Sequence, residues 1–453
     1  MNSVEPARDA PAYAFYGDDF TGATDTLAHL ARAGLRTMLF LAPPDAARLS
    51  TLDGLDALGV AGAARTMSPE AQHEELARIG AAFAALGVRV MHYKVCSTFD
   101  SAPQIGSIGE AVRTLRVFCP NPLVAIVGGQ PNLRRYCAFG QLFAASGADE
   151  DQRAVYRIDR HPTMRHHPVT PMNEADLRIH LQRQGLENVQ SIDWRCYAQG
   201  DALRAAVRDR LSAHPDAVLF DVLDETHLKA IGETIVQYAA AHAPLLAVGA
   251  SSVAQAYALA LGKDRARDTP ATLQPLTPAR GPVFVLAGSL SPLTKVQIAA
   301  AHSYLRVELD PQHMTGDAAS TYLATRVAAI AGALRDGRSV LAYTARLSEP
   351  SARAAPQLAH ACAALLREVL GMVQLQRIGI AGGDTSSLAV RALDAWGLSY
   401  LAPLGSGVAV CRLHSDRDAL DGIEIMLKGG QMGDAGLFEQ LLHGDSADES
   451  GNA

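Results

Sequence analysis

The sequence predicts an α/β protein of two domains, each a mainly parallel sheet flanked by helices. Short apolar runs alternate with Ala-rich segments of helical spacing along most of the chain, which is typical of βαβ units. A polar, proline-punctuated stretch from Lys263 to Pro282 divides this alternation in two. The 453 residues also exceed what a single hydrophobic core usually supports. We therefore expect one domain at residues 1–270 and a second at residues 271–453.

The composition, with 48% hydrophobic and 19% charged residues, is that of an ordinary globular protein. A formal net charge of −7, without a basic block or a Cys/His zinc spacing, argues against a nucleic-acid partner. The polar first residues contain no apolar signal segment, and no run reaches transmembrane length. The six cysteines form no CxxC pair, which suits a reducing compartment. We expect a cytoplasmic protein without a membrane partner, and a homodimer as the commonest oligomer.

Strands are predicted where a short apolar run ends at glycine, proline or polar residues. Those of the first domain are Ala12–Tyr16, Thr37–Leu41, Leu58–Ala61, Val88–Val95, Leu123–Val127, Ala217–Asp221 and Leu245–Val248. The helical segments among them include Thr26–Gly34, Pro69–Leu86 and Asp201–His214. Residues 149–175 interrupt the alternation with charges, prolines and histidines, and we interpret them as a long functional or dimer-contacting excursion.

The second domain repeats this logic. Its predicted strands are Val283–Ala287, Ser339–Tyr343, Arg377–Ala381, Gly407–Leu413 and Glu424–Leu427. Three of them run into a loop of small polar residues followed by a helix, at Thr294–Ala301, Leu388–Trp396 and Leu437–Leu442. Glycine lets backbone amides approach a phosphate, and the start of a helix supplies positive potential. Three such loops in one domain predict a nucleotide site, although neither a Gly-x-x-x-x-Gly-Lys-Ser/Thr string nor a protein-kinase signature is present.

The loop after the first strand concentrates acidic groups. Asp18, Asp19 and Asp25 lie within eight residues, interspersed with Thr21 and Gly22. Ligands of open α/β sheets bind beyond the carboxyl ends of the strands, where this loop lies. Carboxylates buried so close together would repel one another unless cations or ligand hydroxyls lay beside them. The loop is therefore a candidate site. The alternative is an Asx turn in which Asp25 is only a helix N-cap.

This loop closely resembles the opening motif of the four-carbon acid sugar kinase family, a strand followed by Gly-Asp-Asp-x-Thr-Gly-Ala-x-Asp. Every position is matched, by Gly17, Asp18, Asp19, Thr21, Gly22, Ala23 and Asp25. The resemblance covers nearly the whole chain. It implies ATP- and Mg²⁺-dependent phosphorylation of a small acid sugar, in a cleft between a sugar-binding N-terminal domain and a nucleotide-binding C-terminal domain. One of the three aspartates would then orient and deprotonate the attacking hydroxyl, with Asp19 as the working choice.

On the substrate side, the segment from His92 to Ser101 resembles the family's Lys-x-x-Ser-Thr-x-Asp-Ser loop, and a Gly-x-Ile-Gly string follows it. A small acid needs a cation for its carboxylate and acceptors for its hydroxyls. The resemblance makes substrate-binding candidates of Lys94, Ser97 and Asp100, and of Arg65 and Arg134 in two further loops. Solvated surface cations are the alternative for the two arginines.

The three loops of the second domain are similar to the family's nucleotide loops. These are a serine-bearing strand end, a Gly-Gly-Glu/Asp-Thr-Ser loop and a Lys-x-Gly-x-x-Gly loop. The ATP-contacting candidates that this implies are Ser289, Gly382, Gly383, Asp384, Thr385 and Gly430. The sequence departs from the common pattern at Asp384, where many relatives carry glutamate, and at Gly429–Met432, where Ser-Gly-Asn-Phe is common. Plain turn residues are the alternative.

Residues 160–170 contain His161, His166 and His167 among prolines. Their spacing fits no helical histidine pair, so we assign no metal ligand there or elsewhere. Family members place a similar segment near the substrate, which implies a lid or wall.

Two other functions are open: a non-catalytic sensor of sugar acids, and a metal-dependent lyase or isomerase that uses the aspartate cluster. No DNA-binding or signalling module is evident, and a lyase would leave the glycine loops unexplained. Threonate, erythronate, 3-oxo-tetronates and the branched 3-oxo-isoapionate all fit the family resemblance as kinase substrates. An assay of ADP release with a panel of sugar acids separates the three functions.

Overall fold

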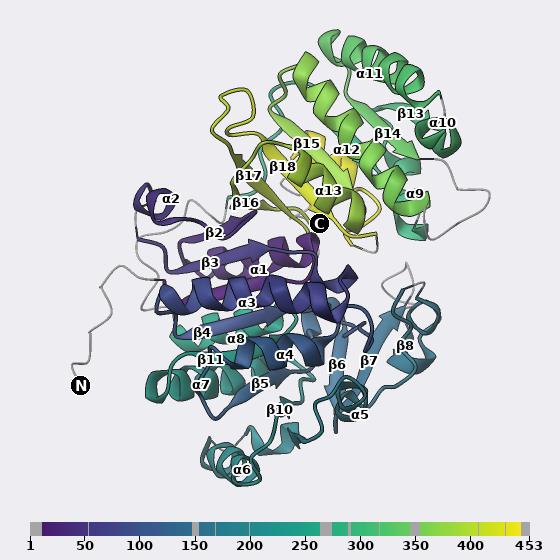
Figure 1. The fold of residues 1–453 in the computed structure, drawn as a ribbon. Helices are drawn as coiled ribbons and strands as arrows, with labels where there is room; N and C mark the ends of the chain where they lie inside the picture. The colour runs from purple at the N-terminus through teal and green to yellow at the C-terminus, as the bar shows by residue number, and fades with distance from the viewer. Residues whose placement is uncertain are drawn as a thin grey trace, which may run out of the picture. The chain divides into compact units, whose positions relative to one another are not determined.

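The structure is a computed structural model. It describes residues 11–444 except 53, 147–153, 168, 199, 263–273, 289, 290, 317, 345–353, 406 and 431. The chain forms two compact units, residues 1–269 (unit 1) and residues 270–453 (unit 2). Both are built on sheets flanked by helices, so the α/β prediction is confirmed (Figure 1).

Unit 1 alternates strands and helices over most of its length. Its main strands are β1 (Tyr13–Gly17), β2 (Thr37–Phe40), β3 (Ala57–Ala61), β4 (Val90–Lys94), β5 (Val124–Val127), β9 (Val189–Ile192), β10 (Ala217–Phe220) and β11 (Leu245–Gly249). Its helices are α1 (Phe20–Arg32), α2 (Ala46–Ser50), α3 (Pro69–Ala85), α4 (Ile108–Arg116), α5 (Leu177–Gln182), α6 (Gly200–Ser212), α7 (Glu225–Ala241) and α8 (Ser252–Leu261).

The main sheet of unit 1 has the strand order β2-β3-β1-β4-β11-β5-β10-β9. Every neighbouring pair in this order is parallel. Figure 1 shows α3 and α4 on one face of the sheet and α1 and α8 on the other. Helices on both faces explain why the strands are apolar runs rather than alternating patterns, since both sides of each strand are buried. Phe15, for example, is completely buried.

A second sheet in unit 1 was not predicted. Strands β6 (Arg135–Ala138), β7 (Gln141–Ser146) and β8 (Ala154–Arg157) form a three-stranded antiparallel sheet. The turn between β6 and β7 consists of Phe139 and Gly140, both with positive φ, and it lacks the usual Asn-Gly signal of a hairpin. The excursion predicted at residues 149–175 therefore continues, in its described residues, a sheet that begins earlier in the chain.

Unit 2 is smaller and has a mixed sheet. Its strands are β12 (Phe284–Ala287), β13 (Leu305–Leu309), β14 (Val340–Thr344), β15 (Arg377–Ala381), β16 (Gly397–Pro403), β17 (Ala409–His414) and β18 (Glu424–Lys428). Its helices are α9 (Pro292–Ala300), α10 (Pro311–Thr315), α11 (Ala319–Arg335), α12 (Ala354–Met372), α13 (Gly383–Ala392) and α14 (Leu437–His443).

The strand order in unit 2 is β13-β14-β12-β15-β18-β17-β16. The pairs from β13 to β18 are parallel, whereas β17 pairs antiparallel with both β18 and β16. The core between the sheet and α9 and α14 includes Val285, Ile298, Met426, Phe438 and Leu441. Fully burying one such side chain contributes about 1.5–3 kcal/mol, so this packing holds the two helices against the sheet.

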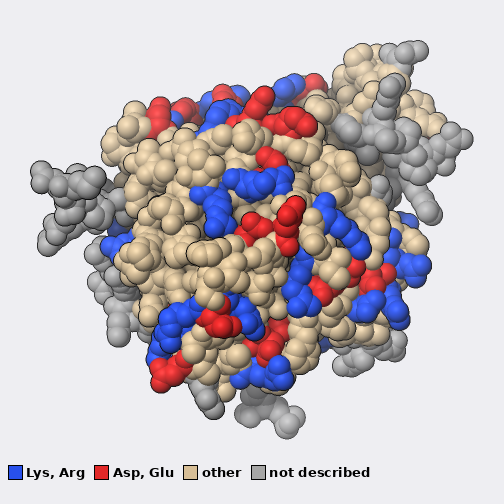
Figure 2. All heavy atoms as spheres, turned by 60° about the horizontal axis from the view of Figure 1, so that its bottom comes forward, with Lys and Arg blue, Asp and Glu red and all other residues tan. Residues whose placement is uncertain are grey.

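Acidic and basic side chains are interspersed on the face drawn in Figure 2 rather than gathered into one extended basic area on that face. Among the described helices, none is both long and apolar enough to cross a membrane.

Candidate active site

The carboxyl edge of the unit 1 sheet brings the predicted acidic loop and a lysine together. In the sheet register, Gly17 at the end of β1 lies opposite Ala61 of β3 and Lys94 of β4. Asp18 and Asp19 follow Gly17 directly, and the Asp18 amide donates to the Lys94 carbonyl at 2.9 Å. The carboxyl ends of parallel strands meet at one edge, which is why these groups, distant in sequence, become neighbours.

Arg65 connects the two adjacent carboxylates. It lies in the 3₁₀ turn Ala64–Thr66 after β3, and its amide donates to the Asp18 carbonyl at 3.1 Å. Its guanidinium binds Asp18 in a bidentate manner, with Nε–Oδ2 at 3.1 Å and Nη2–Oδ1 at 2.8 Å. Its Nη1 lies 3.1 Å from Oδ2 of Asp19. A planar guanidinium suits this geometry, which a lysine could not reproduce. Arg65, predicted as a ligand or as a solvated cation, is a partly buried ion-pair partner of both aspartates.

Lys94 completes the cluster from β4. Its Nζ lies 3.6 Å from Oδ1 of Asp19, and its side chain is 5% exposed. A Cβ added to Gly22 would lie 1.7 Å from this Nζ, so a glycine at that position is required for the lysine to reach the aspartate. The residues of the opening motif thus fit one another sterically as well as electrostatically.

The helix after this loop begins earlier than predicted. Asp19, not Asp25, is the N-cap of α1, and its Oδ1 accepts from the Gly22 amide at 3.0 Å. The helix starts at Phe20 rather than at Thr26, so the acidic loop is part of its first turns. The interpretation of Asp25 as an N-cap is therefore wrong. An N-cap needs a free amide two or three residues ahead, and Asp25 is already inside the helix.

The two adjacent carboxylates differ in pKa. Burial is the largest influence on Asp18 and leaves its pKa raised, although Arg65 opposes the shift. Burial also acts to raise the pKa of Asp19, but Arg65 and Lys94 together outweigh it and hold the pKa well below its ordinary value. Neighbouring carboxylates with divergent pKa values are typical of sites that divide acid–base tasks.

Asp25 lies further along α1 and faces the loop after β5. Its Oδ2 accepts from Nε2 of Gln130 at 3.1 Å, and its Oδ1 lies 3.7 Å from Nε2 of His29. Arg134, at the end of that loop, is partly exposed and has the left-handed φ of 57°. Gln130 was not assigned a role in the sequence analysis. Its place directly after a strand was the available signal.

The loop after β4 holds the remaining substrate candidates. Thr98 Oγ1 donates to Oδ1 of Asp100 at 2.5 Å, and Cys96 Sγ lies 3.0 Å from the same hydroxyl. Burial acts to lower the pKa of Arg65, but nearby acidic groups outweigh it and leave the pKa raised. Asp100 is one of these groups, so its carboxylate lies close enough to interact electrostatically with the cluster. Ser97 is partly exposed in this loop.

The Gly-x-Ile-Gly string that follows is structural. Ser107 is the N-cap of α4, and the Gln184 side chain accepts from the amides of Ile108 and Gly109 at 2.7 and 3.4 Å. A Cβ on Gly109 would lie 2.1 Å from the Gln184 carbonyl oxygen. The amides at the start of α4 are therefore occupied by protein and do not offer an anion site.

The histidine segment makes local contacts. Nδ1 of His161 accepts from the amides of Thr163 and Met164 at 3.2 Å, and Nδ1 of His167 accepts from the Thr170 amide at 3.1 Å. Among the described residues, no group of three or more His, Cys, Asp or Glu side chains could hold a metal ion.

In unit 2 the three predicted loops meet at the carboxyl edge of the sheet. Ala381 of β15 lies opposite Ala287 of β12 and Lys428 of β18 in the register. A Cβ on Gly288 would lie 2.1 Å from Oγ1 of Thr385, so the first loop runs against the start of α13. Ser289 and the side chain of Asp384 lie outside what the structure describes.

The start of α13 has the character of a phosphate loop. Gly382 has φ 129°, a conformation that other residues rarely adopt, and it precedes the helix without a side-chain cap. A Cβ on Gly383 would meet nothing within 4 Å. The helix therefore begins at a glycine with open space on its side-chain side, which would let a phosphate approach its first turn.

The loop after β18 is fixed to α9. The Gly430 carbonyl accepts from the hydroxyls of Ser291 and Thr294, the latter at 3.2 Å. Lys428 at the end of β18 donates to Thr294 Oγ1 at 3.0 Å and to Gln297 Oε1 at 2.6 Å. Gly430 was a predicted contact of ATP, whereas no role was predicted for Lys428, Thr294 or Gln297, although the lysine stands in the third loop motif.

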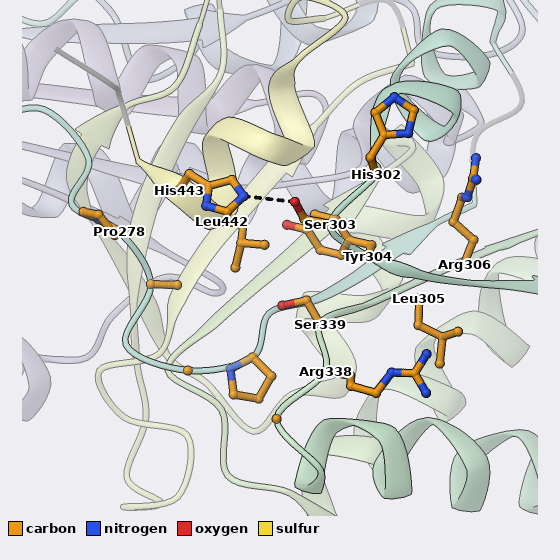
Figure 3. A pocket seen from close by; sticks show the side chains of 14 residues that line it. Pro278, His302, Ser303, Tyr304, Leu305, Arg306, Arg338, Ser339, Leu442 and His443 are labelled. Carbon is orange, nitrogen blue, oxygen red and sulfur yellow. Dashed lines mark hydrogen bonds between the residues drawn. The ribbon is translucent and has the colours of Figure 1, made fainter.

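A pocket of about 740 Å³ lies elsewhere in unit 2 (Figure 3). It is lined by the segments that lead into β12, β13 and β14, and it includes Arg306, Arg338 and Ser303, whose hydroxyl lies 3.1 Å from Nε2 of His443. Because the parallel strands begin there, this pocket lies at the opposite end of the sheet from the glycine loops. It is not the site at which those loops converge.

Comparisons with known proteins match both units. The family model described as "Sugar-binding N-terminal domain" matches residues 13–257, and the one described as "Nucleotide-binding C-terminal domain" matches residues 284–438.

Curated relatives match over nearly the full length. A 3-oxo-isoapionate kinase of Paraburkholderia graminis is 38% identical, over 98% of this chain and 99% of its own. The 3-oxo-tetronate kinases of Cupriavidus necator and Methylobacterium radiotolerans are 30% and 29% identical, over 95% and 94% of this chain and 96% and 97% of theirs.

Two solved structures have the same fold. A protein of Salmonella typhimurium LT2 gives a TM-score of 0.76 at 24% identity, and one of Haemophilus influenzae gives 0.68 at 21%. Each comparison covers 94% of this chain and 98% of the other.

Proposed function

The chain belongs to the four-carbon acid sugar kinase family, and from that premise we propose that it transfers the γ-phosphoryl group of ATP to a hydroxyl of a small acid sugar. In the proposed division of labour, unit 1 binds the acid sugar and unit 2 binds the nucleotide. An active site between the two units remains a prediction.

The observation that carries the proposal is the cluster of Asp18, Asp19, Arg65 and Lys94 at the carboxyl edge of the unit 1 sheet. Its two carboxylates and two cations balance in formal charge, so the cluster can stay ionised in a buried place. Phosphoryl transfer asks the protein to position the acceptor and to stabilise charge rather than to form covalent bonds. A rigid, ionised carboxylate beside the acceptor hydroxyl would position that acceptor.

Asp19 is the carboxylate we assign to the acceptor hydroxyl. Both oxygens of Asp18 are bound by Arg65, and its side chain is 6% exposed. Asp25 is held by Gln130. Both oxygens of Asp19 also have partners, Oδ1 in the Gly22 amide and Oδ2 in the Thr21 hydroxyl and Arg65, but its side chain is 20% exposed and thus more accessible than that of Asp18. Its lowered pKa keeps it ionised at neutral pH. Such a weak base would orient the hydroxyl and accept its proton late, when the bond to phosphorus has begun to form.

The proposed nucleotide site is the carboxyl edge of the unit 2 sheet, and its residues fit a phosphate. Gly383 would offer its backbone amide at the start of α13, since the Gly382 amide is bound to the Lys428 carbonyl, and Thr385 and Gly430 would complete the site. ATP would supply the phosphoryl group that is transferred. Mg²⁺ commonly binds through nucleotide phosphates and water with only one or two carboxylates, which suits the described residues of this chain.

For the acceptor we propose 3-oxo-isoapionate first and a 3-oxo-tetronate second, because the relative at 38% identity acts on the former and those at about 30% on the latter. Lys94 and Arg65 would face the carboxylate of the acid, and Ser97, Asp100 and Arg134 its hydroxyls.

The test is ADP release, measured with a coupled assay, from ATP and a panel of these acids together with threonate and erythronate. We expect turnover with a 3-oxo acid and none when the acid is omitted. Binding of an acid without ADP release would favour a sensor. Conversion of an acid without ATP would favour a lyase or isomerase and would contradict the proposal.

A further inference from the structure

Lys428 is a deeply buried cation with only neutral partners. It is the last residue of β18, it is 1% exposed, and its Nζ donates to the Thr294 hydroxyl and the Gln297 amide oxygen. Its Nζ also lies 6.0 Å from the centre of the Phe438 ring. Among the described residues, no carboxylate lies within ion-pair distance of it. Burial accordingly lowers the pKa of Lys428 to about 8.

At the other end of β18, a second buried cation of this unit is paired with a carboxylate. Arg377, at the start of β15, is also 1% exposed, and it pairs with Glu424 at the start of β18, at 2.6 and 2.7 Å. A buried charge without a counter-charge is costly, and proteins keep one where a ligand or a reaction needs it. The absence of a carboxylate near Lys428, in the described part of the unit, therefore points to an external anion.

The partners of Lys428 also shape the loop that follows it. Thr294 donates to the Gly430 carbonyl, and Nε2 of Gln297 donates to the carbonyls of Met432 and Asp434 at 3.1 and 2.7 Å. Lys428 thus orients two side chains that hold three carbonyls of the loop against α9. Its own carbonyl accepts from the Gly382 amide at 2.9 Å, which connects it to the start of α13.

We propose that Lys428 supplies the positive charge for the phosphates of the bound nucleotide, and that it is the positioning residue which holds the loop after β18 in its binding shape. This inference rests on the proposed function, because it takes the anion to be the phosphate chain of ATP. The inference goes further because it assigns the affinity for the phosphates to one residue, Lys428. The affinity for the neutral adenosine part of the nucleotide should not depend on Lys428.

The experiment compares ATP, titrated by calorimetry, with adenosine, followed by ligand-observed NMR, on the full-length protein. Lys428→Met should raise the Kd for ATP about 10- to 100-fold, the range for losing one charge-assisted contact. Adenosine binding should change by less than about threefold. Lys428→Arg should recover most of the ATP affinity because it restores the charge. Arg338→Met, which removes an exposed cation at the opposite end of the same sheet, is the matched control and should bind ATP normally.

Gln297→Glu provides a second test that keeps the lysine, adds a counter-charge and removes the Nε2 donor to the carbonyls of Met432 and Asp434. It should weaken ATP binding but not adenosine binding, because the new carboxylate competes with phosphate for Lys428. In turnover, both variants should raise KM for ATP and leave KM for the acid unchanged.

Wild-type ATP affinity in Lys428→Met and Gln297→Glu would overturn the inference. An equal loss of ATP and adenosine affinity would also overturn it, since the lysine would then only support the fold. A wild-type protein that binds no ATP would contradict the proposed function itself, and with it this inference.

Discussion

The two buried lysines at strand ends, Lys94 in unit 1 and Lys428 in unit 2, differ in their counter-charges. Each is the last residue of its strand, and each is almost inaccessible to solvent. Burial acts to lower the pKa of Lys94, but Asp19 and Asp18 outweigh it and leave the pKa raised. Lys428 has neutral partners, and burial lowers its pKa. Unit 1 contains its own counter-charge, and the described part of unit 2 contains none for this lysine.

This difference suits different ligands. A cluster that is already balanced suits a singly charged acid sugar, whose hydroxyls it can orient while its two cations lie beside the one carboxylate. An unbalanced cation gains most from a ligand that is itself strongly anionic, such as a triphosphate. The comparison therefore supports the proposed assignment of the acid sugar to unit 1 and of ATP to unit 2, and four predictions test it.

The largest expected effect is on turnover, from Asp19→Asn. Asparagine keeps an oxygen that can cap α1, so the fold should survive, whereas the charge that would orient the hydroxyl is lost. We expect kcat to fall by about two to four powers of ten, the usual range for lost acid–base help. The matched control is Asp45→Asn, which makes the same change at the exposed N-cap of α2 and should leave kcat unchanged. Near-normal turnover of Asp19→Asn would remove this residue from the chemistry.

The second prediction compares stability after Lys94→Met and Lys428→Met. Removing Lys94 takes one of two cations from partly buried Asp19 and leaves Arg65, so the free energy of unfolding of unit 1 should fall, by at most about 3–5 kcal/mol. Removing Lys428 eliminates a buried charge without a counter-charge, but it also leaves Oε1 of Gln297 without its hydrogen-bond donor. These effects oppose each other, so the free energy of unfolding of unit 2 should change by less than about 1 kcal/mol. Hydrogen exchange in β4 and β18, measured without nucleotide, reports the two units separately. Equal losses of unfolding free energy in both variants would contradict the claim that only Lys94 has counter-charges.

The third prediction concerns close approach of a ligand. Gly383→Val places its side chain in open space, so stability should hold while the Kd for ATP rises about tenfold or more. Gly281→Val, also in open space but at the opposite end of the sheet, is the control and should bind ATP normally. In unit 1, by contrast, Gly22→Ala should destabilise the protein itself, because the new methyl group collides with Lys94. Unchanged ATP binding by Gly383→Val would remove α13 from the nucleotide site.

The smallest effect is a pH dependence that falls in a different range in each unit, alkaline in unit 2 and acidic in unit 1. The folded pKa of Lys428 is about 8, below its ordinary value of about 10.5, so between these values the unfolded chain binds the extra proton. The stability of unit 2 should rise with pH in this window, by at most about 1.4 kcal/mol per pH unit, and Lys428→Met should lack the rise. Asp19 has a lowered pKa, so its contribution to unit 1 is present above about pH 4 and is lost as the pH falls further. Hydrogen exchange across both ranges measures this, and a flat alkaline profile for wild-type unit 2 would contradict it.

Much of the fold could be predicted because buried parallel strands are continuous apolar runs. The segment Arg377–Ala381 was predicted as a strand, and β15 has these bounds. The meeting of Asp18, Asp19 and Lys94 followed from the rule that parallel strands end at one edge. Strand β13 was missed because its residues, such as Arg306 and Glu308, alternate with apolar ones and face solvent.

The contacts that complete the sites could not be predicted, because local patterns do not encode long-range pairing. Gln130 and Asp25 are 105 residues apart in sequence, and Lys428 and Thr294 are 134 apart. Arg65 lies in a short 3₁₀ turn whose direction depends on how β3 pairs with β1. The balance of charge at Lys94 and its absence at Lys428 are properties of such contacts, so they became visible only in three dimensions.

The most direct test of the assignment of ligands to the two units is an ATP titration of Asp19→Asn and Lys428→Met beside the wild type. We predict that Asp19→Asn binds ATP within about twofold of wild type, and that Lys428→Met binds it about 10- to 100-fold more weakly. If Asp19→Asn instead lost ATP affinity while Lys428→Met kept it, the acidic loop would belong to the nucleotide, and the two ligands would have to be assigned to the opposite units.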